Sequence, residues 1–166
     1  MHIEDLFEDL EAQFASASVT QTKSSFTSGA KIVEAQLANT ATRKLIAPII
    51  GQDFIAGLDL VSPIWYLYPV ARVRKLRFCD SSESDLPAVR NFEVSLEQFL
   101  GSAPKPCAIR WCTIQDQHHL AIGQLHSLSG GLMFIYQSGV AGPIAVPVAA
   151  LEMMAIESVD NLNGSF

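Results

Sequence analysis

The sequence has few cysteines, no long hydrophobic run and no basic leader, and each absence excludes a class of protein. Its three cysteines, Cys79, Cys107 and Cys112, are odd in number and lack the paired spacing of zinc sites, which indicates reduced thiols in a cytoplasmic protein. No stretch approaches the roughly 18 uninterrupted apolar residues of a membrane span. The start, MHIEDLFEDLE, is acidic, unlike the basic opening of a signal peptide. We therefore expect no membrane partner.

Charged residues are also scarce, at 17% of the 166 residues, whereas apolar residues make up 49%. This balance excludes wholesale disorder, and the length allows one domain or two small ones. The net charge of −6 opposes binding to a polyanion. Its distribution is uneven, because residues 43–77 contain six basic and two acidic side chains, a local +4, whereas residues 106–166 contain one basic and four acidic ones, a local −3.

A ten-residue pattern occurs twice, as PVARVRKLRF at residues 69–78 and as PVAALEMMAI at residues 147–156. Each copy follows a run that ends in tyrosine, IWYLY at 64–68 and LMFIY at 132–136. Three features in the same order, counting a glycine further upstream, predict a duplicated small β module.

Four residues mark the predicted repeat. Gly57 and Gly123 each lie inside an apolar stretch upstream of the tyrosine run, and Pro69 and Pro147 open the ten-residue pattern. We expect Gly57 to superpose on Gly123 and Pro69 on Pro147. A glycine suits the bend of a strongly curved strand, because it has no Cβ.

The predicted fold is mainly β with N-terminal helices, and consists of two tandem small Sm-like or SH3-like β-barrel modules that arose by internal duplication. An immunoglobulin-like sandwich is disfavoured, because each module has too few strands. The predicted boundaries are an N-terminal helical segment with a Ser/Thr-rich linker at 1–42, a first module at 43–79, a linker at 80–92 and a second module at 93–160.

Several elements can be predicted within these boundaries. Apolar spacing indicates helices at 4–15 and 30–41, whereas residues 45–50 fit either a strand or the tail of the second helix. In the second module we expect a short helix at 94–100 and a strand at 108–114 that turns at Asp116-Gln117. We further expect a tight turn at 129–131 and a 3₁₀ turn at 147–150.

The first predicted helix is amphipathic. Leu6, Phe7, Leu10 and Phe14 form its apolar face, and acidic residues fill its first turns, where the helix dipole favours them. Such a face needs a surface to cover it, so we expect it to dock on a barrel of the same chain or of a neighbour.

The block Leu6–Phe14, LFEDLEAQF, together with the Pro-Val-Ala turns, resembles a group of uncharacterised actinobacterial proteins that open with LFEDLEAQ and carry barrel-like repeats behind a helical segment. Some of them are labelled Fis-like transcriptional regulators. The chain departs from that group at SASVTQTKSSFTSG, where the group has a long Arg/Ala-rich helix. The resemblance implies no catalytic residue, cofactor or ligand.

The residues closest to a chemical site are Cys107, Cys112, His118, His119 and His126. They form no C-x₂-C or H-x₃-H pair, and structural zinc requires four ligands at such spacing. A Cys-His nucleophilic pair with Asp116 lacks any sign of oxyanion donors. We therefore predict no catalytic residue, no metal and no cofactor.

A basic strip, Arg72, Arg74, Lys75 and Arg77, is the stronger functional feature. On a terminal strand it would protect an edge from unwanted pairing or would pair with the acidic helix. It could also contact phosphates, with Trp65 and Trp111 as stacking residues. We expect both tryptophans to lie in the core instead.

These observations predict a non-enzymatic cytoplasmic protein that acts by protein–protein association of Sm-like modules, either with a protein partner or by self-association, for example as a dimer. The alternative is an RNA- or DNA-binding regulator that uses the basic strand 72–77.

Overall fold

The computed structural model describes residues 21–22, 29–39, 41–59, 64–80 and 86–157. Within these residues, no helix is both long and apolar enough to cross a membrane. The helix predicted at 4–15, with its docking face Leu6, Phe7, Leu10 and Phe14, lies outside the described residues.

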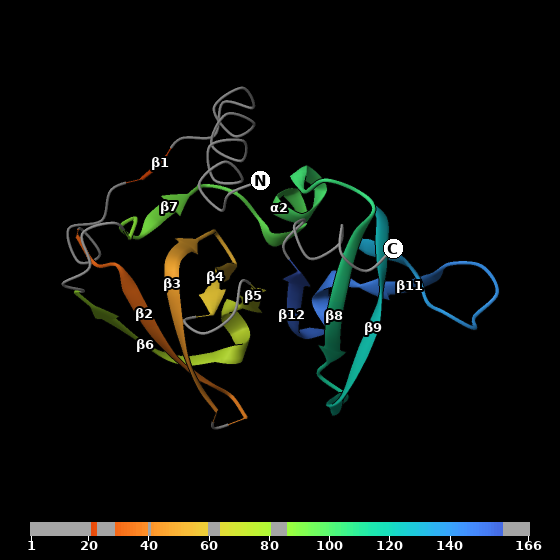
Figure 1. Ribbon diagram of the computed structural model, residues 1–166, viewed down its shortest axis with the longest axis horizontal. Coiled ribbons are helices and arrows are strands. Elements are labelled where there is room, and N and C mark those ends of the chain that lie inside the picture. The colour runs from red at the N-terminus through yellow and green to blue at the C-terminus, as the bar shows by residue number, and fades with distance from the viewer. Residues whose placement is uncertain (1–20, 23–28, 40, 60–63, 81–85, 158–166) are drawn as a thin grey trace.

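The described part of the chain is mainly β, as predicted, and its strands form one sheet with two groups lying side by side (Figure 1). The first strand group contains β2 (Ile32–Leu37), β3 (Thr42–Ile50), β4 (Phe54–Asp59), β5 (Ile64–Pro69), the 3₁₀ turn η1 (Val70–Arg72) and β6 (Val73–Cys79). The second strand group contains α2 (Leu96–Ser102), β8 (Cys107–Thr113), β9 (Asp116–Ser129), β10 (Leu132–Tyr136), β11 (Ile144–Pro147), the 3₁₀ turn η2 (Val148–Ala150) and β12 (Leu151–Glu157).

The two groups have the same pairing order. In the first group the strands follow one another as antiparallel neighbours from β2 to β5, and β6 returns to pair with β2. In the second group they do so from β8 to β11, and β12 returns to pair with β8. Each group therefore closes its fifth strand onto its first.

The two Pro-Val-Ala segments have the same local structure. Pro69 (φ −57°, ψ 139°) precedes η1, and Pro147 (φ −63°, ψ 134°) precedes η2. The amide that follows each proline donates to the preceding hairpin, Val70 N to Asp53 O at 2.8 Å and Val148 N to Gly131 O at 2.9 Å. The proline ring fixes φ near the value that both turns use, so this part of the pattern is encoded locally.

The ends of the two turns also match. The carbonyl of Arg72 accepts from Ala38 N at 2.9 Å, and the carbonyl of Ala150 accepts from Ile114 N at 2.9 Å. The second residue of the following strand then stands in a bulge, Arg74 in β6 and Glu152 in β12, because the ladder skips it in both groups. Arg72 thus corresponds to Ala150, and Arg74 corresponds to Glu152.

The expected match of Gly57 with Gly123 is wrong, because the two glycines lie on different strands. Gly57 lies on β4, the third strand of its group, and Gly123 lies on β9, the second strand. A Cβ on Gly57 would lie 2.6 Å from Leu45 Cβ, and a Cβ on Gly123 would lie 2.7 Å from Ile135 Cγ2. Since the turns are offset by 78 residues (147 − 69), Leu45 corresponds to Gly123 and Gly57 to Ile135. In both groups a glycine thus contacts a bulky residue at the same place. The glycine stands on the third strand in the first group and on the second strand in the second group.

The tyrosine-ended runs do not match either. Residues 64–68 lie in β5, the fourth strand of the first group, whereas residues 132–136 form β10, the third strand of the second. The strand equivalent to β5 is the shorter β11. A short continuous run of apolar residues fits either strand of such a group, so its composition does not fix its position.

The helix predicted at 30–41 is also wrong, because this segment contains β2. Val33, Ala35 and Leu37 are buried and Glu34 and Gln36 are not, which is the two-residue period of a strand. Residues 45–50 belong to β3, so the first strand group begins at Ile32 rather than at residue 43. The predicted linker 80–92 ends in a short strand, β7 (Arg90–Phe92), which pairs with β1 (Gln21–Thr22) and runs parallel to β3.

In the second group, the short helix and the tight turn predicted from local sequence patterns are both present. The predicted short helix is α2, and its capping box joins Ser95 to Gln98. Gly130 and Gly131 have φ values of 59° and 75° in the predicted tight turn. The turn between β8 and β9 falls at residues 114–115, two positions before the predicted one.

The main core is shared between the two groups. It joins Phe54 and Leu67 of the first group to Ile109 and Met154 of the second, and packs against the inner side of α2. Trp65 and Trp111 lie in it with exposed fractions of 4% and 3%, which confirms their predicted core position. A smaller cluster, which includes Val33, Leu45 and Tyr68, fills the first group, and Met153 of β12 packs against it.

Candidate functional site at the junction of the strand groups

The two groups meet where β5 pairs with β12. The register is antiparallel and places Met154 opposite Leu67, Ala155 opposite Tyr66, Ile156 opposite Trp65 and Glu157 opposite Ile64. The fourth strand of one group therefore pairs with the fifth strand of the other, a head-to-tail contact between different edges. Among the described residues, the matching strands β6 and β11 each have a neighbour on one side only.

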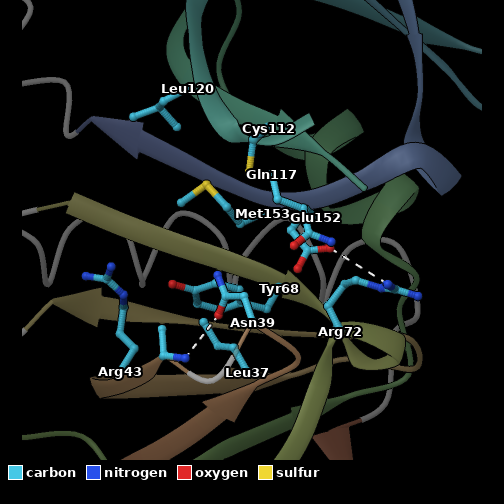
Figure 2. Close-up of a pocket in the computed structure, with 11 residues that line it drawn as sticks. Leu37, Asn39, Arg43, Tyr68, Arg72, Cys112, Gln117, Leu120, Glu152 and Met153 are labelled. Atoms are coloured by element: carbon cyan, nitrogen blue, oxygen red, sulfur yellow. Dashed lines mark hydrogen bonds and ion pairs between the residues drawn. The ribbon is translucent and has the colours of Figure 1, made fainter. Parts of the chain in front are cut away.

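A cavity of about 170 Å³ opens beside this junction (Figure 2). Both groups line it, with Tyr68 and Arg72 from the first and Cys112, Glu152 and Met153 from the second. The β2–β3 hairpin adds Leu37, Asn39, Ala41 and Arg43, and β9 adds Gln117 and Leu120.

An ion pair crosses the junction in this cavity. Arg72 Nη1 lies 3.8 Å from Glu152 Oε2, and the side chains are 27% and 5% exposed (Figure 2). Glu152 is the one charged residue among the buried positions described. Within the described part of the chain, Glu152 Oε2 and Arg72 Nε have no hydrogen-bond partner. The pair is therefore held by charge and burial, without a direct hydrogen bond.

Arg43 forms a second polar contact on the same side of the first group. Its guanidinium lies 4.0 Å from the centroid of the Tyr66 ring and 3.6 Å from Asp59 Oδ2. Burial raises the pKa of the neighbouring Tyr68 hydroxyl well above its usual value, and Arg43 opposes that rise. The hydroxyl therefore stays protonated and acts as a neutral polar group.

The predicted basic strip is not a uniform surface. Arg72 turns into the junction towards Glu152, and Arg77 Nη2 lies 3.0 Å from Glu34 Oε2 across the β2–β6 pair. Arg74 and Lys75 are exposed, and no ion pair is formed by either within the described ranges. Two of the four cations are thus neutralised, which weakens the strip as a phosphate-binding surface.

The cysteines and histidines considered in the sequence are dispersed. The described residues contain no group of three metal-ligating side chains. Cys112 lines the junction cavity, Cys107 is buried in the main core, and burial raises both thiol pKa values. His126 packs edge-on against Tyr136, with ring centroids 4.4 Å apart, whereas His118 and His119 are exposed.

A wider, open cavity of about 670 Å³ lies where both Pro-Val-Ala turns face the start of α2. Its carboxylates already accept backbone hydrogen bonds, Asp53 Oδ1 from Leu96 N at 2.7 Å and Glu97 Oε1 from Gly131 N at 3.0 Å. These bonds tie α2 to a hairpin of each group, so the carboxylates have a structural task.

Glu152 is the site residue that the sequence analysis missed. It is the first of two acidic residues in LEMMAIE, and it occupies the place that Arg74 has in the other copy of the pattern. A charge reversal at matched repeat positions is the signal that could have identified it.

A comparison of the chain with protein-family models, curated proteins and solved structures found no match.

Proposed function

We propose that each strand group is a small Sm-like or SH3-like β-barrel module and that the two arose by duplication. The shared strand order supports this, as do the matching 3₁₀ turns with their equivalent hydrogen bonds. The bulge at the second residue of β6 and of β12 adds a third, independent likeness.

On this basis the protein is non-enzymatic and works by associating such modules edge to edge. The observation that carries the proposal is the β5–β12 contact, because it already joins two modules through a strand ladder. That contact leaves one unpaired edge of each kind, β6 and β11, among the described residues. Exposed strand edges present backbone donors and acceptors that a partner strand can use.

The apolar side chains of the junction show why such a contact is stable. Leu67, Trp65 and Met154 are each at most 4% exposed and belong to the shared core. Burying a side chain of this size contributes roughly 1.5–3 kcal/mol. Apolar burial therefore provides most of the stability, and the ladder sets the register.

Binding of RNA or DNA through residues 72–77 is the competing function. It requires several free cations on one surface, whereas Arg72 and Arg77 are held by carboxylates. The net charge of −6 also opposes it.

Two measurements separate these functions. Cross-linking with mass spectrometry in extracts of the source cells should join Lys75, exposed on β6, to a partner protein. Lys44 serves as the matched control, because it is also exposed but stands on β3, which has a neighbouring strand on each side. Anisotropy titrations with mixed oligonucleotides at low and moderate salt should show no oligonucleotide affinity that falls steeply as the salt concentration rises. Salt-dependent oligonucleotide binding without cross-links at Lys75 would replace association with nucleic-acid binding.

A further inference from the structure

We propose that the β6 edge binds a strand from a partner protein that places a carboxylate against Arg74. This inference rests on the proposed function, since it takes edge-to-edge association of modules as given. It adds the edge that is used and the charge that the partner must carry.

The β5–β12 contact is the template. It brings the last residue of η1, Arg72, to the bulge residue of β12, Glu152, at 3.8 Å. Both positions follow from the module itself, because the turn succeeds the fourth strand and the bulge opens the fifth. Any contact of the same kind will therefore join a turn residue to a bulge residue.

At the β6 edge, which pairs with β2 alone among the described residues, the bulge residue is Arg74, so the sign of the charge is reversed. Arg74 is exposed, whereas Glu152 at the equivalent place is buried in the junction. A partner that docks as β5 does would bury Arg74 to a similar degree. A buried charge is costly unless it is paired, so the turn of the partner must supply an acidic side chain.

A second, unmodified copy of this chain does not meet that requirement. Its corresponding edge is β11, and its turn ends in Ala150 where η1 has Arg72. The backbone of that edge is otherwise suitable, because Ile144 and Ala145 occupy the places of Tyr66 and Leu67. The missing element is the carboxylate.

The rest of the β6 edge agrees with a docking role. Leu76 and Phe78 are half-buried and pack on the smaller core cluster, at the places that Met154 and Ile156 have in the junction. Lys75, which is exposed beside them, adds positive charge and favours an acidic partner over a neutral one.

The absence of a carboxylate at position 150 provides the test. The full-length Ala150→Glu variant serves as an acidic-turn probe for the β6 edge of another copy, and association is measured by analytical ultracentrifugation at low salt. We expect at least a tenfold lower dissociation constant for self-association than in the wild type. Ala149→Glu, at the exposed neighbouring position, adds the same charge and should have no such effect.

Substitutions at Arg74 complete the experiment. Arg74→Glu in the Ala150→Glu background should abolish the gain, and Arg74→Glu combined with Ala150→Arg should restore it. Circular dichroism melting of each variant checks that the fold is retained. Equal association of the two glutamate variants would overturn the proposal, as would a gain that survives Arg74→Glu.

These outcomes are distinct from failure of the proposed function. If Lys75 cross-links to a partner but association is indifferent to the charge at position 74, the edge is used and only this inference is wrong. If no partner is found at Lys75 and oligonucleotides bind, the proposed function itself is wrong.

Discussion

The contact between Leu45 and Gly57 offers a quantitative test of how the two strand groups are related. A Cβ added to Gly57 would lie 2.6 Å from Leu45 Cβ and 3.2 Å from Ile46 O. Carbon atoms in contact normally lie about 3.5–4.0 Å apart, so the Gly57→Ala variant must separate the strands by roughly 1 Å. Overpacking of this kind costs about 1–3 kcal/mol.

The reverse change at the same contact also costs stability. Leu45 is 0% exposed, so Leu45→Ala should cost about 2–5 kcal/mol through lost burial and the cavity that remains. Because the second group places Gly123 and Ile135 at the equivalent positions, the contact tolerates the bulky residue on either strand. The compensating partner is Leu45→Gly, because Leu45→Ala keeps the Cβ that would lie 2.6 Å from the new methyl group. In the double variant Leu45→Gly/Gly57→Ala that Cβ is gone, so the new methyl group no longer clashes with residue 45. Its cost should therefore fall below the sum of the single costs by roughly 1–3 kcal/mol.

Urea unfolding followed by circular dichroism measures these free energies, with a constant m-value as the check on two-state behaviour. Gly101→Ala is the matched control, because a Cβ there meets nothing within 4 Å and the residue lies in α2. That control should be neutral or stabilising by up to about 1 kcal/mol. A harmless Gly57→Ala variant, or a double variant as costly as the two singles together, would refute the reasoning.

Three further predictions concern the junction, the pH dependence and the N-terminus. Glu152→Ala should lower the free energy of unfolding by about 1–3 kcal/mol in urea titrations, because Arg72 then loses its counter-charge, and Arg72→Met in the same background should recover part of the loss. Burial raises the pKa of Tyr68 above its usual 10.0 and that of the Cys107 thiol above 9.0. In the unfolded chain these groups ionise at a lower pH than in the folded protein, so the stability that they contribute is complete below about pH 9 and is lost as the pH rises further. The difference in the free energy of unfolding between pH 8 and pH 10.5 should therefore be smaller in Tyr68→Phe than in the wild type. Removal of residues 1–15 should lower solubility or change the oligomeric state in light scattering, since burying three large apolar side chains contributes roughly 5–8 kcal/mol before entropy; an equally stable and monodisperse product would contradict docking of that segment.

The correct parts of the sequence analysis are those that neighbouring residues encode. Pro69 and Pro147 set the backbone of the turns through their own rings, and Gly130-Gly131 supplies the positive φ angles of a tight hairpin. These features were visible because each depends on a few consecutive residues.

The errors arose where a contact between strands decides the outcome. A glycine on either of two neighbouring strands can relieve a crowded contact between them. Gly57 and Gly123 therefore looked equivalent in the sequence, although they stand on opposite strands of that contact. Residues 32–37 carry apolar side chains that fit a helix face or a strand, and only pairing with β3 and β6 selects the strand. The role of Glu152 depends on how β12 meets β5, a register that no local pattern contains.

The charges at the turn and bulge positions also explain why the two strand groups pair in one way. Three arrangements of fourth strand on fifth strand are open to copies of this chain besides the observed one. β5 on the β6 edge of another copy would bring Arg72 to Arg74, and like charges repel. Pairing of β11 with β12 would place Glu152 against Ala150, which has no charge. Pairing of β11 with β6 would place Arg74 against the same uncharged Ala150. Only β5 on β12 joins opposite charges. The reversal of charge between the two copies of the pattern therefore favours the internal junction over its competitors, and it leaves Arg74 as the position where an acidic partner would be recognised.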